Sequence, residues 1–116
     1  MDINKLKVDL LASMNMYQGI NSARTGQKLA IDYGVSIRLI QKAIESLRAD
    51  GHPVCSNDNY NAGCMGYFIP ISREEADSFF LSAKARARKT FISVANVAKA
   101  LNAKFGVDEY QMELSL

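Results

Sequence analysis

The chain has 116 residues, enough to bury one core, and a formal net charge of +2 that argues only weakly for a polyanionic partner. Hydrophobic residues make up 48% of the chain, and no apolar run approaches the roughly 18 residues that a membrane-spanning helix needs. Residues 1–11 show no basic start leading into an apolar stretch, so we expect no signal peptide and a cytoplasmic location.

The charge is unevenly distributed along the chain. Residues 1–72 contain seven Lys/Arg and six Asp/Glu, residues 73–104 contain seven and three, and residues 105–116 contain none and three. The three segments therefore have net charges of +1, +4 and −3. Any strongly basic surface is expected in the segment 73–104.

Residues 2–15 are predicted to form the first helix. Apolar side chains recur there at steps of three and four, namely Ile3, Leu6, Leu10, Leu11 and Met14. Residues 17–25 are polar and contain Gly19, so they are expected to be a connection. Thr25, at its end, is placed to cap the helix that follows.

Residues 26–48 have the spacing of two helices joined by a tight turn. Ala30 is small enough for two helices to cross closely, and Gly34 can adopt the left-handed conformation that ends a helix. Ser36 then offers a hydroxyl oxygen as the cap of the next helix. This spacing is typical of a helix-turn-helix, whose second helix enters the DNA major groove.

The second of these helices is expected over residues 36–49, with two distinct faces. Its inward stripe is Ile37, Ile40, Ile44 and Leu47. Its outward side chains are Arg38, Gln41, Lys42 and Glu45. Gly51 ends the helix and Pro53 prevents its continuation.

Residues 53–71 are expected to form a β-hairpin. A short apolar segment at 53–56 and an aromatic, β-branched segment at 64–71 flank residues 57–63, which are rich in turn formers. A hairpin directly after a recognition-type helix is a wing. Residues 1–71 are therefore predicted to be one winged helix-turn-helix domain, and the fold to be mainly α with a small β-hairpin.

The two cysteines, Cys55 and Cys64, flank the expected turn. We expect reduced thiols pointing from the strands of a cytosolic protein. A structural zinc site needs four ligands, and His52 is the only histidine. We therefore predict no metal and no cofactor.

Residues 72–116 are expected to form a long C-terminal helix with a short acidic tail. Ser72 and Glu75 match a capping box, and no Pro or Gly follows until Gly106. A helix of roughly 32 residues would be about 48 Å long. The tail, residues 107–116, is expected to be a short turn or a frayed end.

A heptad-like stripe runs along this long helix. It comprises Phe80, Lys84, Ala87, Phe91, Val94, Ala98, Leu101 and Phe105. Only Lys84 interrupts its apolar character. We predict that the other seven residues pair two copies of the chain; the alternative is that the helix bends back and covers the winged domain.

The contacts expected with duplex DNA follow from the predicted motif. Arg38, Gln41 and Lys42 would enter the major groove, where Arg pairs with guanine and Gln with adenine. Residues expected at helix ends near phosphates are Ser22, Arg24, Thr25, Gln27 and Ser36. The alternative for each side chain is a solvated surface position.

Two further segments leave their roles open. Asn59, Tyr60 and Asn61 in the wing can bond phosphates or base edges, but the wing contains no cation and can equally be a plain turn. The basic run Lys84, Arg86, Arg88 and Lys89 either lies near flanking phosphates or is a solvated face.

Residues 1–104 resemble a known family. Most of this resemblance lies in two segments, Ser36 to Gly51 and Gly66 to Glu75. The chain resembles the N-terminal winged-helix module of biotin-repressor-type regulators, and more closely small phage- and prophage-encoded winged-helix proteins. The resemblance implies DNA binding in transcription regulation or phage replication, inside a bacterial or phage-infected host cell. It assigns contacts to Ser36, Arg38, Gln41, Lys42 and the wing.

The sequence thus favours a homodimeric, sequence-specific binder of double-stranded DNA. The second hypothesis is a protein-docking module on a winged-helix scaffold, which the low charge of residues 1–72 favours. An enzyme is not expected. The sequence has no Gly-rich phosphate loop, and His52 in its Gly-His-Pro corner is poorly placed to activate a cysteine.

Overall fold

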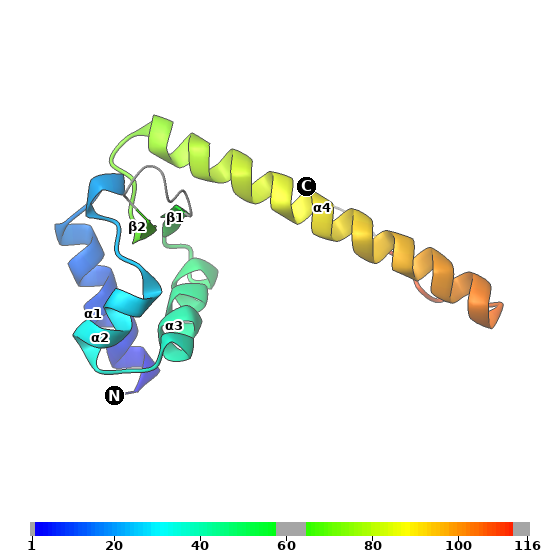
Figure 1. The fold of residues 1–116 in the computed structure, drawn as a ribbon, viewed down its shortest axis with the longest axis horizontal. Coiled ribbons are helices and arrows are strands. Elements are labelled where there is room, and N and C mark those ends of the chain that lie inside the picture. Colours follow the sequence, from blue (N-terminus) through cyan, green and yellow to red (C-terminus); the bar gives the residue numbers. More distant parts are fainter. Residues whose placement is uncertain (1, 58–64, 113–116) are drawn as a thin grey trace. The chain divides into compact units, whose positions relative to one another are not determined.

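A computed structural model describes residues 2–57 and 65–112 (Figure 1). The elements in chain order are α1 (Ile3–Met16), η1 (Ile20–Ser22), α2 (Gly26–Tyr33), α3 (Ile37–Ala49), β1 (Cys55–Asn57), β2 (Gly66–Phe68) and α4 (Arg73–Phe105). The predicted fold class is confirmed: a helix-turn-helix is followed by a two-stranded hairpin and a long C-terminal helix. None of the described helices is both long and apolar enough to cross a bilayer.

The chain divides into two compact units, Met1–Phe79 and Phe80–Leu116. The first unit holds α1 to β2 and the first turns of α4, so it extends past the expected limit at residue 71. Glu75 explains this extension, because its carboxylate accepts hydrogen bonds from the backbone N–H of Ile20 (3.0 Å) and of Ile71 (3.3 Å). The start of α4 is thereby bonded to η1.

Side-chain caps begin the helices where the sequence indicated. The hydroxyls of Thr25 and Ser36 accept hydrogen bonds from the third N–H of α2 and α3, each at 3.1 Å. Gly34 ends α2 with φ of 65°, in the left-handed region. Ser72 caps α4 by accepting from the N–H of Glu75 at 3.2 Å. Local chemistry therefore sets the turn of the helix-turn-helix.

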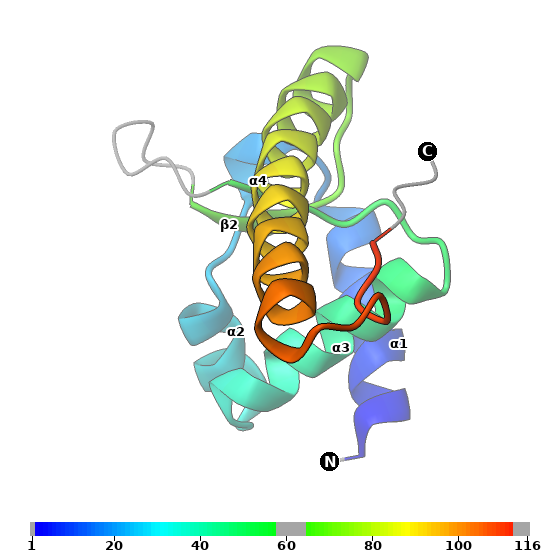
Figure 2. The ribbon, with the colours of Figure 1, turned by 90° about the vertical axis from the view of Figure 1, so that its right-hand side faces the viewer.

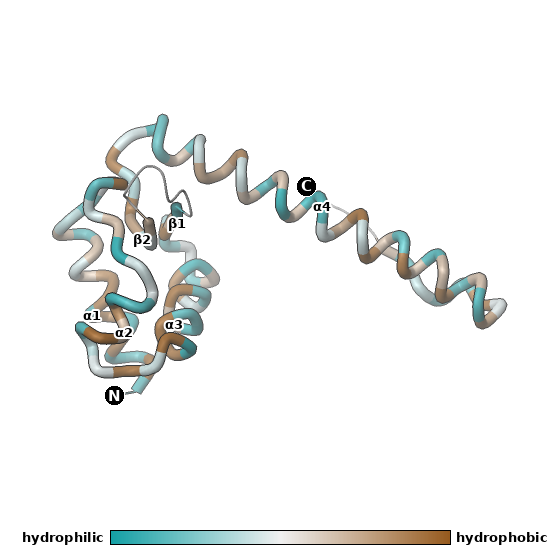
Figure 3. Tube along the Cα trace, viewed as in Figure 1, coloured by the Kyte–Doolittle hydropathy of each residue, from teal (hydrophilic) through white to brown (hydrophobic). Residues whose placement is uncertain are grey.

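The core of the first unit lies where α3 packs against α1 and α2, as Figures 1 and 2 show. Hydrophobic positions recur on all three helices (Figure 3). The buried cluster is Leu6, Leu10, Met14, Leu29, Ala30, Ile40, Ala43, Ile44, Leu47, Val54 and Ile69. One expected core residue is wrong: Ile37 is 44% exposed, because it is the first residue of α3.

The hairpin has a third, single-residue partner that the sequence analysis missed. β1 and β2 pair antiparallel, with Ser56 opposite Tyr67. Arg24 then bridges the other edge of β2: its N–H donates to the Tyr67 carbonyl at 3.1 Å and its carbonyl accepts from the Tyr67 N–H at 2.8 Å. Gly66 is required here, since a Cβ on it would lie 2.1 Å from the Arg24 carbonyl.

The second unit consists of the rest of α4 and a tail that returns along it. No residue of α4 is buried. After Gly106, the amide group of Asn102 donates to the Tyr110 carbonyl at 2.9 Å and accepts from the Tyr110 N–H at 3.0 Å. Residues 107–112 therefore fold back onto the end of α4, so of the two alternatives expected for the tail the frayed end is wrong for this part of it.

Candidate nucleic-acid interface

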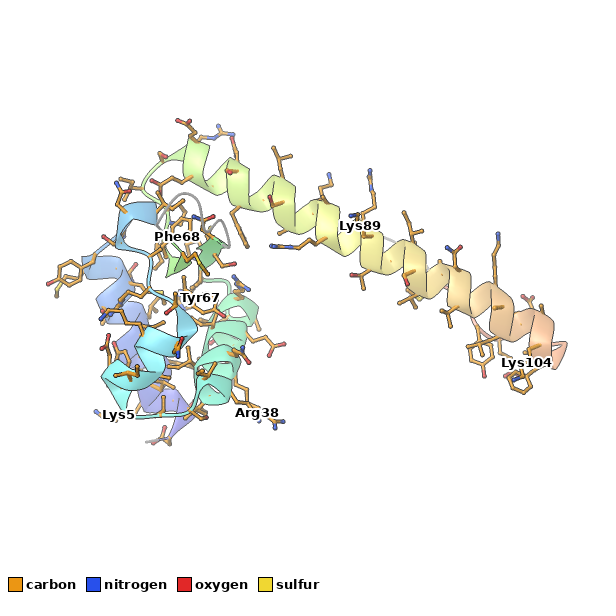
Figure 4. All side chains as sticks on the ribbon, in the orientation of Figure 1. Lys5, Arg38, Tyr67, Phe68, Lys89 and Lys104 are labelled. Carbon is orange, nitrogen blue, oxygen red and sulfur yellow. The ribbon has the colours of Figure 1, made fainter. Side chains whose placement is uncertain are left out.

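The outward face of α3 presents Arg38, Gln41 and Lys42 to solvent. Burial of Ile40, Ala43, Ile44 and Leu47 fixes the rotation of this helix about its axis. The three polar side chains then lie on the opposite side and are exposed. Figure 4 shows Arg38 extending away from α3. Within the described residues, none of the three has an ion pair or hydrogen bond.

This face has a small net positive charge. Arg38 and Lys42 are one helical turn apart, and Glu45 shares their side of α3. The carboxylate of Glu45 would repel a phosphate, so the face has an excess of one positive charge. Such a surface suits hydrogen bonding to base edges better than strong attraction to the DNA backbone.

The capping hydroxyls of Thr25 and Ser36 can each still donate one hydrogen bond. A hydroxyl that accepts from a backbone N–H keeps its own proton to donate. Ser36 is exposed and Thr25 is half-buried. Both sit at helix N-termini, where the helix dipole favours an anion. Gln27 is exposed in the first turn of α2 and adds an amide to this surface.

Arg24 and Ser22 are less available than the sequence suggested. The Arg24 guanidinium donates to the hydroxyl oxygen of Ser13 on α1 at 2.7 Å, in a partly buried position. Its backbone is already paired with Tyr67. Ser22 is half-buried in η1, with its N–H bonded to the Gly19 carbonyl at 3.0 Å. Arg24 thus links α1 to β2, while its contact with a phosphate stays a prediction.

The wing contributes only partly to the described surface. Asn59, Tyr60 and Asn61 lie outside the described residues. Tyr67 of β2 lies beside Gly26 at the start of α2, where a Cβ on the glycine would be 3.6 Å from its ring (Figure 4). The hairpin is thereby packed against the N-terminus of α2.

Arg48 is an organising residue that the sequence pattern did not single out. Its Nε donates to the Val54 carbonyl at 2.9 Å, and its guanidinium carbon lies 6.0 Å from the Tyr67 ring centre and 5.5 Å from that of Phe79. The guanidinium also donates to the Ser56 hydroxyl of β1 at 3.4 Å, so Arg48 links the end of α3 to both strands and to the first turns of α4. A basic residue in the last turn of a helix was the available indication.

Two titratable groups of the first unit have shifted pKa values. A hydrogen bond from Lys7 (2.6 Å), together with its positive charge, lowers the pKa of Asp50 and joins α1 to the end of α3. Burial raises the pKa of the Cys55 thiol. Cys55 is therefore a poor nucleophile at neutral pH. No three potential metal ligands gather among the described residues.

The predicted dimerisation residues differ in exposure. Phe80 (61% exposed), Phe105 (59%) and Val94 (44%) are open to solvent, as is Ala87. Phe91, Ala98 and Leu101 are half-buried. Part of this cover is the tail, since Ala95 and Ala98 line one hollow together with Tyr110 and Met112. The second unit thus presents an apolar stripe that its own tail covers only in part.

Comparison of the chain with protein-family models, curated proteins and solved structures gives no match.

Proposed function

We propose that this protein binds double-stranded DNA in a sequence-specific manner, with α3 in the major groove. The observation that carries the proposal is the outward face of α3. Arg38, Gln41 and Lys42 are exposed there without partners in the described chain. Arg and Gln are the side chains that pair bidentately with guanine and adenine.

The surroundings of α3 support the same function. Capped N-termini at Thr25 and Ser36 begin the two helices of the helix-turn-helix, where backbone phosphates would approach. The mechanism we propose is recognition alone, without catalysis or cofactor. On the resemblance to phage-type winged-helix proteins, it would serve transcription regulation or replication.

We also propose that the DNA-binding form is a homodimer paired through α4. The exposed Phe80, Val94 and Phe105 belong to the heptad-like stripe of α4, and a second copy would cover them. A twofold dimer carries two copies of α3 and favours a palindromic site.

The experiment that tests the proposal is operator selection from random duplexes, followed by binding of the selected site. Wild-type chain is compared with Arg38→Ala/Lys42→Ala, and folding is checked by circular dichroism. We expect the folded double variant to bind the selected site at least tenfold more weakly, since each bidentate pair contributes about 1–3 kcal/mol of discrimination. A folded variant with wild-type affinity would remove α3 from the interface.

A second candidate function, protein docking, is favoured by two exposed isoleucines of the helix-turn-helix. Ile31 is 76% exposed on α2, and Ile37 is exposed at the start of α3. Contiguous exposed apolar patches mark protein-binding surfaces, and under this second function both side chains would belong to one such patch. A chain that selects no DNA sequence, and whose partner is lost with Ile31→Ser/Ile37→Ser, would establish this function instead.

A further inference from the structure

The later part of α4 is the most one-sidedly charged stretch of the chain. Residues 78–107 contain six Lys/Arg and no Asp or Glu. The six are Lys84, Arg86, Arg88, Lys89, Lys99 and Lys104. None of the contacts assigned to α3 uses this charge.

Opposite its apolar stripe, α4 has a polar face with small and basic side chains. This face, which we name the basic face, comprises Ser82, Arg86, Lys89, Ser93, Asn96, Ala100 and Lys104. It begins two residues after Phe80 and keeps the alternating steps of four and three as far as Ala100; Lys104, four residues further on, lies at the edge of this face next to Phe105. Two residues correspond to about 200° of rotation, so the basic face and the apolar stripe lie on opposite sides.

Every residue of the basic face is exposed. Lys89 extends from α4 into solvent (Figure 4) and has no ion pair or hydrogen bond within the described residues. The ammonium of Lys104 lies 5.5 Å from the ring centre of Phe105, without a carboxylate partner among the described residues. Both cations are therefore available to an external anion.

We infer that the basic face is a second, sequence-independent DNA contact that binds the phosphate backbone. Its small residues let a phosphate chain approach the helix closely, and Ser82, Ser93 and Asn96 supply hydrogen-bond donors to phosphate oxygens. From Ser82 to Lys104 it is about 33 Å long. That length is close to one turn of duplex, roughly 34 Å.

The charge of the recognition helix explains why such a contact is needed. The face of α3 has an excess of one positive charge, whereas non-specific affinity for DNA comes from the number of phosphates that cations neutralise. The inference rests on the proposed function and assigns its two parts to different helices: α3 selects the sequence, and the basic face of α4 supplies affinity for the DNA backbone. An apolar stripe on the opposite side of α4 stays free for a second copy.

The test measures fluorescence anisotropy of the full chain with two duplexes of unrelated sequence, between about 50 and 200 mM salt. The variant is Lys89→Gln/Lys104→Gln, and the matched control is the charge-conserving Lys89→Arg/Lys104→Arg. Each lost phosphate contact lowers the salt slope by about 0.9, so we expect a slope lower by about 2. The corresponding loss of affinity is about 10- to 100-fold near 0.1 M salt, equal for both duplexes. The control should bind like wild type.

Several outcomes separate this inference from the proposed function. A wild-type slope in the Gln variant would overturn the basic face and leave α3 untouched. A lower slope in that variant, with no effect of Arg38→Ala/Lys42→Ala on the selected site, would uphold the basic face and remove α3. Wild-type chain that binds phosphatidylserine vesicles but no duplex would overturn the inference in favour of a membrane surface.

Discussion

The two units of this chain contain similar stripes of apolar residues, but only the first unit buries them. In the first unit, the stripes of α1, α2 and α3 meet and form a core that includes Leu10, Ile40 and Leu47. In the second, α4 presents phenylalanines and valines at equally regular spacing, yet none is buried. A regular apolar stripe therefore identifies a helix face that needs a partner, but whether that partner belongs to the same chain depends on the neighbouring elements.

The sharpest way to break the first unit is Gly66→Ala. The new Cβ would lie 2.1 Å from the Arg24 carbonyl, and φ at this position is +120°, where side chains are strained. We expect a loss of roughly 2–6 kcal/mol in the free energy of unfolding, as the sum of strain and overpacking.

The matched control for that variant is Gly34→Ala. Its φ is +65°, but no atom lies within 4 Å of the added Cβ, so only the left-handed strain of about 1–2 kcal/mol applies. Urea denaturation of both variants measures the difference. Equal losses at the two glycines would contradict the close contact between Gly66 and Arg24.

Truncating Ile40 and Val97 to alanine compares a buried side chain of the first unit with an exposed side chain of the second. Ile40 is fully buried, so its truncation should cost about 2–5 kcal/mol. Val97 on α4 is 54% exposed, and Val97→Ala should change stability by no more than about 0.5 kcal/mol. Thermal and urea denaturation compare the two. A larger loss at Val97 would show that α4 has a buried face after all.

Some parts of this contrast were predictable from sequence, and some were not. The helix-turn-helix was predictable, because Gly34 ends α2 and Ser36 caps α3 through the backbone next to them. The Arg24 bridge was not, since a single-residue pairing with Tyr67 leaves no periodic pattern. The tail folds back because Asn102 and Tyr110 are hydrogen-bonded, and no periodic sequence pattern predicts such a single bond.

Within the candidate site, the sequence could predict which side chains are exposed, but not which of them are already hydrogen-bonded within the protein. Arg38, Gln41 and Lys42 follow from the helical period, since the buried stripe fixes their direction. Arg24 looked equivalent in sequence, but its guanidinium bonds to Ser13 eleven residues earlier. Such a contact depends on how α1 packs beside β2, which only the tertiary structure gives.

Phe91→Asp tests whether a second copy covers the apolar stripe of α4. A carboxylate on the stripe should convert dimers to monomers, because burying it in the seam without a partner is costly. Light scattering at several concentrations measures the mass. Ser93→Asp adds the same charge on the opposite face and should stay dimeric. A dimeric Phe91→Asp variant would exclude this stripe as the interface.

The smallest expected effect concerns the ion pair between Lys7 and Asp50. Lys7 lowers the pKa of Asp50, so the pair stabilises the fold above the unfolded carboxyl's pKa of about 3.9. That contribution disappears as pH falls through the lowered folded value. Asp50→Asn should therefore be less stable than wild type at pH 7, and the gap should close in acid. A gap that persists at pH 2 would assign the effect to another cause.

The measurement that tests the central claim most directly is anisotropy of a selected duplex with wild-type chain and with Arg38→Ala/Lys42→Ala. We predict salt-dependent binding by the wild-type chain, and at least tenfold weaker binding with relaxed sequence preference in the folded variant. Absence of wild-type binding at about 50 mM salt would contradict DNA recognition by this protein. Identical affinity and preference in the two chains would contradict recognition through α3.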